Sequence, residues 1–299
     1  MLPDFLVVGP PKCASTSLHF YLNQHPAIFM SPEKEINFFN RHYGKGLSFY
    51  EHYFTKAKAG QKIGEATPEY AFLPFAADRI KATIPQVKII FSFRQPAERA
   101  FSDWLMFWDA GVEVADFKTA IDINLRQMEH FNYEGEKGAA IWLDRVNHVG
   151  QSDKWVRAYI QGGQYGEMLK KYLSLFPTEQ VHYLFLDDLK MDFDKSMQSI
   201  FTFLGVDGHF IIPDKEDKNF YYDRKVYKNL IKIIGLRPAR RLAHLMPDKI
   251  KDVFKQKKYQ VIAKPQLNEE EKKRLNTIFK PDIQLLESLT GRNLNHWYN

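Results

Sequence analysis

The sequence predicts an α/β fold with a central, mostly parallel sheet flanked by helices. Two observations predict it: apolar runs typical of buried strands recur along the chain, and segments with helical periodicity lie between them. Strands that alternate with helices form parallel sheets whose two faces are both covered. The 299 residues, 44% of them hydrophobic, can bury a sizeable core. We therefore expect a single domain over residues 1–299.

The expected elements have boundaries set by helix-start and helix-stop signals. Pro26 ends the first helix, Pro96 opens the second, and Gly205 follows the third. In the last helix Asn268 is a candidate N-cap, and Pro281 predicts a bend. In chain order, we expect strand 5–9, helix 15–24, strand 86–94, helix 96–107, strand 180–186, helix 195–204 and helix 268–289.

Two regions stand apart from this alternation. Residues 109–162 are rich in tryptophan, histidine and polar residues with weak periodicity, so we expect an insertion over the site that acts as a lid. The formal net charge is +6, but residues 215–264 alone carry a net +10 and the rest sums to −4. Such a basic region indicates either an anionic partner or the solvated face of amphipathic helices, and both readings stay open.

Cysteine usage and the apolar runs bear on the compartment. Cys13 is the single cysteine, so we expect no internal disulfide and no cysteine-rich zinc site. The first residues lack the basic region and the long apolar stretch of a signal peptide. No run of about 18 apolar residues predicts a membrane span. We expect a cytoplasmic protein without a transmembrane segment.

The first turn of the chain gathers groups that suit an anion. The expected strand ends at Gly9, Lys12 follows in the turn, and Ser15, Thr16 and Ser17 open the expected helix. Backbone N–H groups, hydroxyls and a cation then meet at one point, which suits a phosphate or a phosphosulfate. A nucleotide-hydrolase loop would need a second glycine directly before the lysine, so this turn does not demand magnesium. An ordinary turn capped by Ser15 is the alternative.

Two further segments carry chemistry. Arg94 ends the second expected strand, and Ser102 follows eight residues later in a helix, so both side chains suit one phosphate. Arg99, between them, is expected to make structural ion pairs. Residues 31–39 place Glu35 next to apolar side chains, where desolvation would raise the pKa of its carboxyl toward the range of a general base. A solvated loop with a hydrophobic anchor is the alternative for this segment.

Taken together and in this order, the three segments resemble the sulfotransferases that use 3′-phosphoadenosine 5′-phosphosulfate (PAPS). The resemblance is closest to the branch that contains bacterial sulfotransferases and the heparan sulfate N- and 3-O-sulfotransferases. That family has Pro-Lys-x-Gly-Thr-Thr-x-Leu, then Lys-Glu-x-x-Phe-Phe, then Arg-x-Pro-x2-Arg-x2-Ser-x-Tyr/Trp. The matching residues are 11–18, 34–39 and 94–104, with further likeness at 64–70, 163–177, 203–205 and 289–297.

The resemblance implies a reaction and roles for the candidate residues. Lys12 would contact the phosphosulfate and its bridging oxygen, and Glu35 would be the general base. Arg94 and Ser102 would hold the 3′-phosphate. Sulfuryl transfer needs an acceptor in line with the leaving phosphate, a base, and positive charge on the leaving oxygen. The implied donor-binding residues are Lys12, Cys13, Ala14, Ser15, Thr16, Ser17, Arg94, Ser102, Lys218 and Arg224.

The expected donor is PAPS, which leaves as 3′-phosphoadenosine 5′-phosphate (PAP), and no metal is expected. The expected acceptor is a small molecule or a carbohydrate with a hydroxyl or an amine or amide nitrogen; we expect no nucleic acid, and nothing indicates an oligomeric state. Ala14 stands where the family usually has glycine, and we expect it to fit if that position needs no positive φ. Ala66 stands where the 3-O-sulfotransferases have lysine, so glycan specificity does not carry over.

Two other functions stay open at this point. A P-loop kinase or nucleotide hydrolase would need Gly-Lys-Ser/Thr and a magnesium-holding aspartate after a second strand, whereas the second expected strand ends in Arg94. A non-catalytic binder of an anionic polymer or membrane would act through residues 215–264. It would bind in a salt-sensitive manner without transferring sulfate.

Overall fold

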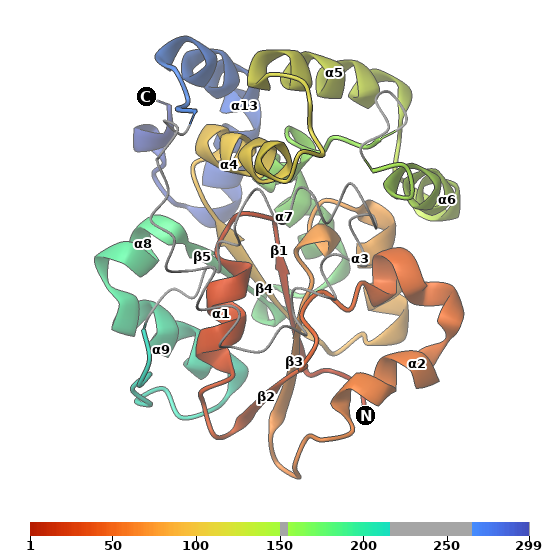
Figure 1. The fold of residues 1–299 in the computed structure, drawn as a ribbon. Coiled ribbons are helices and arrows are strands. Elements are labelled where there is room, and N and C mark those ends of the chain that lie inside the picture. The colour runs from red at the N-terminus through yellow and green to blue at the C-terminus, as the bar shows by residue number, and fades with distance from the viewer. Residues whose placement is uncertain (150–154, 216–264, 299) are drawn as a thin grey trace, which may run out of the picture.

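The computed structural model describes residues 1–149, 155–215 and 265–298, and its centre is a parallel sheet (Figure 1). In these ranges the sheet has five strands in the order β2-β3-β1-β4-β5, and every neighbouring pair is parallel. This confirms the expected α/β fold. The strands are β1 (Phe5–Gly9), β2 (Ile28–Met30), β3 (Lys62–Ala66), β4 (Lys88–Phe93) and β5 (Val181–Phe185).

Alternate side chains of β1 enter two hydrophobic cores, one on each face of the sheet. Leu6 and Val8 join the larger core, which includes side chains of α3 (Pro74–Thr83), α7 (Tyr165–Leu175) and α13 (Glu269–Thr290). Phe5 and Val7 join the smaller core with α1 (Ser15–Leu22) and α9 (Phe193–Leu204). The period of two along the strand explains why its residues are apolar without alternation.

The elements expected from the sequence are present with small shifts at their ends. The second helix is α4 (Pro96–Asp109), two residues longer than expected. Asn268 caps α13 by accepting a hydrogen bond from the Glu271 N–H at 2.7 Å, and the helix continues through Pro281. Gly205 ends α9 with a φ of 76°. The sequence analysis missed β2 and β3, the two strands on one side of β1.

Further helices connect these elements. Two of them matter for the site below: η4 follows β3 in the sequence, and η1 begins in the segment that runs along the carboxyl end of β3. The remaining helices in the described ranges are η1 (Phe38–His42), η2 (Tyr43–Lys45), α2 (Leu47–Glu51), η3 (His52–Phe54), η4 (Pro68–Tyr70), α5 (Phe117–His130), α6 (Gly135–Val146), η6 (Gln161–Gly163), η7 (Thr178–Gln180), α8 (Leu186–Met191) and η8 (Asn295–Trp297).

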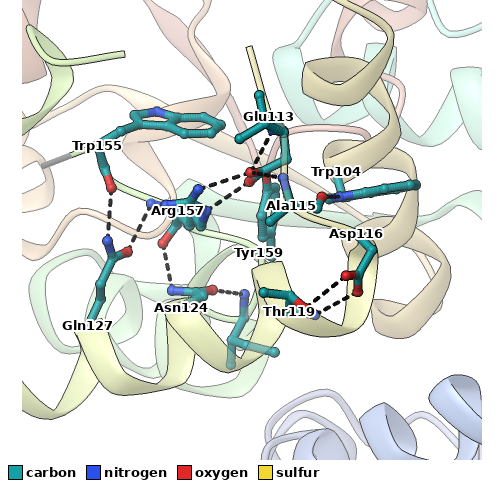
Figure 2. A network of polar contacts seen from close by, with 12 residues as sticks. Trp104, Glu113, Ala115, Asp116, Thr119, Asn124, Gln127, Trp155, Arg157 and Tyr159 are labelled. Atoms are coloured by element: carbon teal, nitrogen blue, oxygen red, sulfur yellow. Dashed lines mark hydrogen bonds and ion pairs between the residues drawn. The ribbon is translucent and has the colours of Figure 1, made fainter. Parts of the chain in front are cut away.

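The expected insertion over 109–162 contains more regular structure than its weak periodicity indicated. Its described part forms α5 and α6 and surrounds a buried ion pair (Figure 2). Arg157 Nε lies 2.8 Å from Glu113 Oε2, and Tyr159 donates its hydroxyl to the same oxygen at 3.0 Å. From α5, Asn124 donates to the Arg157 carbonyl, and Gln127 donates to the Trp155 carbonyl at 2.9 Å. A role as a lid stays a prediction.

Part of the sequence analysis falls on residues that the structure does not describe. The basic region lies outside the described residues except for Lys215, and so do the proposed nucleotide contacts Lys218 and Arg224. Within the described ranges, no helix combines the length and apolar character needed to cross a bilayer.

Candidate functional site

The turn between β1 and α1 (residues 10–14, the β1–α1 loop) lies at the carboxyl end of the central strand. In Figure 1 this end of the sheet points toward α4 and α5. Gly9 has a φ of 98°, and a Cβ atom there would lie 2.5 Å from the Cα of Pro68. Only glycine therefore allows β1 to leave the sheet along this path. The helix starts at Ser15, so its first N–H groups face the loop.

The β1–α1 loop is held from below by buried groups of β4 and α4. Ser92 of β4 donates its hydroxyl to the Cys13 carbonyl. Arg99 is fully buried, forms an ion pair with Asp103 at 3.1 Å, and donates to the Pro11 carbonyl at 3.4 Å. The structural ion pair expected for Arg99 is thus confirmed. These contacts fix the loop backbone from the side of the hydrophobic core.

Lys12 projects from this loop into a crowded, cationic setting. Its side chain is half-buried, and its Nζ lies 3.9 Å from the sulfur of Met106. Burial lowers the pKa of Lys12, and the nearby carboxylate of Asp103 opposes this shift. Further cations lower the same pKa: Arg94, Arg99 and Lys34. A half-buried ammonium among like charges is favoured when an anion binds next to it.

The hydroxyls at the start of α1 divide into two groups. Ser15 and Ser17 are buried, with 5% and 8% of their surface exposed, whereas Thr16 is exposed. Ser15 does not cap the helix, because the N-cap is Ala14, which has no side-chain hydrogen bond to the helix. The N-cap residue thus supplies no side-chain oxygen to the first N–H groups of the helix, which suits these groups to an anion.

Ala14 has a left-handed backbone, with a φ of 63°. We expected alanine to fit here if the position needs no positive φ, and that condition is not met, because the loop reaches the helix through the left-handed region. A side chain in that region costs about 1–2 kcal/mol.

The left-handed region is used at very few places by residues other than glycine. In the described part of the chain these are Lys12, Ala14, Glu35 and Asn37. All four fall in the β1–α1 loop or in residues 31–39, which we call the Glu35 segment. Such backbone strain persists only where the surrounding structure fixes it, and it tends to mark functional sites. The structure therefore singles out the same two segments that the sequence analysis identified.

The Glu35 segment follows β2 and runs along the carboxyl end of β3. Ser31 N–H donates to the Gly64 carbonyl at 2.9 Å, and Glu35 N–H donates to the Ala66 carbonyl at 3.0 Å. Because Ala66 pairs in register with Val7 of β1, the segment lies next to the strand that carries the β1–α1 loop.

The side chain of Glu35 does not have the apolar walls that we expected. It is 42% exposed, and one carboxylate oxygen lies 2.7 Å from the Nζ of Lys34. The apolar neighbours Ile36, Phe38 and Phe39 are buried in the core instead. The left-handed φ of 62° at Glu35 turns its side chain away from them. The expected desolvation of this carboxyl is therefore wrong for this structure.

Arg94 and Ser102 lie on one path from β4 into α4. Arg94 follows the last residue of β4, and its guanidinium lies 3.0 Å from the carboxylate of Glu98. Ser102 is half-buried on α4, about 9 Å along the helix axis from Pro96. Arg94 thus stands at the carboxyl end of a third strand beside β1, where ligands of such sheets bind.

Sequence reasoning missed an acidic group close to the Glu35 segment, the carboxyl of Glu65 near the end of β3. Its side chain is fully buried and accepts hydrogen bonds from Tyr50, Thr67 and Tyr70. Burial raises the pKa of Glu65, and the three hydroxyls oppose that shift. The available signal was the segment 64–70, because the part that resembles the family includes this acidic residue.

A metal site is not apparent in the described ranges, where histidine, cysteine and acidic side chains form no group of three or more suited to an ion. The site instead offers cations, helix N–H groups and hydroxyls at three adjacent strand ends. This set of groups suits an anion with more than one phosphate.

Comparisons with known proteins point to one family. The family model described as "Sulfotransferase domain" matches residues 2–286. Over 106 residues the chain is 39% identical to the membrane-associated sulfotransferase kil1 of Dictyostelium discoideum, which covers 34% of this chain and 22% of that protein. It is 28% identical over 213 residues to bifunctional heparan sulfate N-deacetylase/N-sulfotransferase 2 of Homo sapiens, covering 69% of this chain and 22% of that protein. The match thus spans about a fifth of the length of these relatives.

Two further similarities extend over more of the compared proteins. The chain is 26% identical over 223 residues to heparan sulfate glucosamine 3-O-sulfotransferase 3B1 of Mus musculus, covering 75% of this chain and 50% of that protein. A crystal structure of a sulfotransferase from Alicyclobacillus acidocaldarius superposes with a TM-score of 0.70 and 22% identity, covering 100% of both chains. At that identity the superposition supports the fold alone.

Proposed function

Because this chain belongs to the sulfotransferase family, we propose that it transfers a sulfuryl group from PAPS to an acceptor hydroxyl or nitrogen. The observation that carries the proposal is the meeting of three segments at adjacent strand ends. The β1–α1 loop supplies Lys12 and the start of α1, the Glu35 segment supplies a carboxylate, and β4 ends in Arg94. A donor with two phosphate sites and a proton-releasing acceptor matches this set of groups.

In the proposed mechanism the loop and the helix start hold the 5′-phosphosulfate. The acceptor atom attacks sulfur while the bond from sulfur to the bridging phosphate oxygen breaks, and PAP leaves. Lys12 stabilises the negative charge that develops on this oxygen. Burial lowers the pKa of Lys12, and the bound anion favours the ammonium form that this role requires. The N–H groups of α1 and the hydroxyls of Ser15, Thr16 and Ser17 bind the 5′-phosphate.

Glu35 takes the proton that the acceptor loses on attack. Its carboxylate is accessible and lies next to Lys34 at 2.7 Å, so the base role rests on position and not on desolvation. An acceptor that approaches from solvent meets Glu35 without the need to open a buried pocket.

Arg94 and Ser102 bind the 3′-phosphate in this proposal. Arg94 is paired with Glu98 at 3.0 Å, and both side chains are partly exposed. Exposed ion pairs of this kind contribute little free energy, about 0–1 kcal/mol. A doubly charged phosphate therefore competes well with Glu98 for the guanidinium.

We propose a small molecule or a carbohydrate as the acceptor. Two of the relatives are named for heparan sulfate, and the chain has Ala66 beside the Glu35 segment where a lysine would add a cation for such a polymer. This difference favours an acceptor with less negative charge than heparan sulfate.

Calorimetric titration with PAP, performed with EDTA present, tests the proposal. We expect binding that does not require magnesium and that protects the protein against thermal unfolding. Turnover of ATP that depends on magnesium would contradict it in favour of a kinase or hydrolase. Salt-sensitive binding to heparin or nucleic acid, with no transfer of labelled sulfate to any acceptor, would instead indicate a polymer binder.

A further inference from the structure

Glu65 is a buried acidic group with hydroxyl partners. Its side chain has no exposed surface, and no ion pair joins it to a lysine or arginine in the ranges that the structure describes. Tyr50 of α2, Thr67 and Tyr70 of η4 each donate a hydroxyl proton to it, Tyr70 at 2.9 Å. A carboxylate accepts all three protons, since it has two oxygens and no proton of its own. Burial of a carboxylate away from water costs free energy, which these three hydrogen bonds offset.

Two of the three hydroxyls also contact the backbone of the Glu35 segment. Thr67 Oγ1 accepts a hydrogen bond from the Asn37 N–H at 3.4 Å, and the Tyr70 hydroxyl accepts one from the Phe39 N–H at 3.3 Å. Each hydroxyl has one proton, and it can accept a hydrogen bond from a backbone N–H of the segment only while this proton points away from that N–H. Both hydroxyls direct their protons to the carboxylate of Glu65.

The third hydroxyl, of Tyr50, differs in one respect. It donates to the same carboxylate, but no hydrogen bond joins it to the backbone of the Glu35 segment among the described contacts. Its ring stacks on Phe38, with ring centroids 4.3 Å apart and an interplanar angle of 6°. Tyr50 therefore provides a matched control for the two hydroxyls that reach the segment.

From these contacts we infer that Glu65 is a positioning residue that fixes the backbone of residues 35–39 and thereby the direction of the Glu35 carboxylate. The inference rests on the proposed role of Glu35 as the base. Glu65 orients the hydroxyls of Thr67 and Tyr70, and these hold Asn37 and Phe39. The segment needs such a hold because Glu35 and Asn37 both adopt left-handed conformations, with φ of 62° and 57°.

Both hydroxyls that hold the segment donate to the same oxygen, Oε1 of Glu65, whereas Tyr50 donates to Oε2. A glutamine amide presents two N–H donors in place of one carboxylate oxygen. When the glutamine oxygen takes the place of Oε1, Thr67 and Tyr70 keep their acceptor, and only the Tyr50 hydroxyl has to accept from the amide. Leucine at position 65 removes both acceptor oxygens, so the hydroxyl protons of Thr67 and Tyr70 turn toward the backbone N–H groups of the segment, and the segment loses its holds.

The first test compares transfer by four variants. We expect Glu65→Leu, Thr67→Val and Tyr70→Phe to slow the release of labelled sulfate from PAPS to water by on the order of 10–10²-fold, because a small displacement of a catalytic group has such effects. Their dissociation constants for PAP should stay within about twofold of the parent value, since no donor contact changes. Tyr50→Phe removes a hydrogen bond from the same carboxylate and should leave the rate within about twofold.

The second test does not depend on activity. Amide hydrogen exchange of Asn37 and Phe39, measured by NMR in the full chain, should be faster in Glu65→Leu at both positions. Thr67→Val should affect Asn37, Tyr70→Phe should affect Phe39, and Tyr50→Phe neither. If Glu65→Leu does not fold, Thr67→Val and Tyr70→Phe still decide between the two outcomes. Unchanged exchange in all variants, or an equal rate loss in Tyr50→Phe, would overturn the inference. A parent that binds no PAP but shows the expected exchange pattern would contradict only the proposed function.

Discussion

The β1–α1 loop and the Glu35 segment use the same backbone feature in opposite surroundings. Each contains two residues other than glycine in the left-handed region. The loop is pinned from the protein interior by Ser92 and by the fully buried Arg99. The Glu35 segment buries its apolar side chains but leaves its carboxylate 42% exposed beside Lys34.

This difference indicates a division of labour. In the loop, burial and neighbouring cations lower the pKa of Lys12, so this charge is best stabilised by a bound anion. In the Glu35 segment, the carboxylate faces solvent, from which an acceptor arrives. We infer that the β1–α1 loop binds the donor and that the Glu35 segment serves the acceptor.

The largest expected effect on the rate of sulfate transfer comes from a change in the Glu35 segment. Glu35→Gln should lower the rate of sulfate transfer by about 10²–10⁴-fold, because the amide cannot take the acceptor proton. Initial rates with PAPS carrying labelled sulfate measure this loss, with water or a screened acceptor. Glu33→Gln, which changes an exposed carboxyl two residues earlier, is the matched control and should keep the parent rate. Full activity of Glu35→Gln would show that another group takes the proton.

A change in the β1–α1 loop should impair both sulfate transfer and donor binding. Lys12→Ala should lower transfer by about 10²–10³-fold, as expected when one donor to a developing negative charge is removed. It should also weaken PAP binding, in contrast to Glu35→Gln. Lys170→Ala, at a lysine on α7 whose side chain is 62% exposed, is the control for loss of one positive charge. Parent-like donor binding by Lys12→Ala would contradict the division of labour.

A smaller effect is expected on stability. Ala14→Gly should raise the free energy of unfolding by about 1 kcal/mol, because glycine adopts a φ of 63° without strain. Ala140→Gly, at an exposed position inside α6, should lower it by about 1 kcal/mol. Urea unfolding of the two variants measures this contrast in sign. A loss of stability in both would mean that the loop is not strained at Ala14.

The smallest expected signal is a lack of reaction at Cys13. Its thiol is fully buried 3.7 Å from the Tyr165 hydroxyl, and burial raises its pKa to about 11. At pH 8 only about one thiol in a thousand would then be ionised. Mass spectrometry should show alkylation by iodoacetamide at least about 10²-fold slower in the native protein than in urea. Rapid native alkylation would show that the loop opens in solution.

The sequence predicted those parts of the fold whose signals are local. β1 matches its expected bounds because Phe5-Leu-Val-Val-Gly9 is an uninterrupted apolar run that ends in glycine. Asn268 and Gly205 act as helix caps through their own side chain or backbone, so their roles are visible in the sequence. By contrast, β2 has three residues, and β3 contains Lys62, Gly64 and Glu65, which no strand pattern favours.

Other features of the site depend on contacts between distant residues. The partners of Glu65 come from α2 and η4, so only the folded chain shows why an acidic residue is stable inside a strand. The exposure of Glu35 follows from its left-handed backbone, which apolar neighbours in the sequence do not reveal. The positive φ of Ala14 is likewise set by the path from β1 to α1.

Parallel titration of PAP into the parent, Lys12→Ala and Glu35→Gln, with EDTA present, tests the division of labour most directly because it needs no acceptor. We expect the dissociation constant to rise at least about tenfold in Lys12→Ala, the equivalent of about 1.4 kcal/mol. In Glu35→Gln it should stay within about twofold of the parent value. An equal loss of PAP affinity in both variants, or a loss confined to Glu35→Gln, would contradict the assignment of donor binding to the β1–α1 loop.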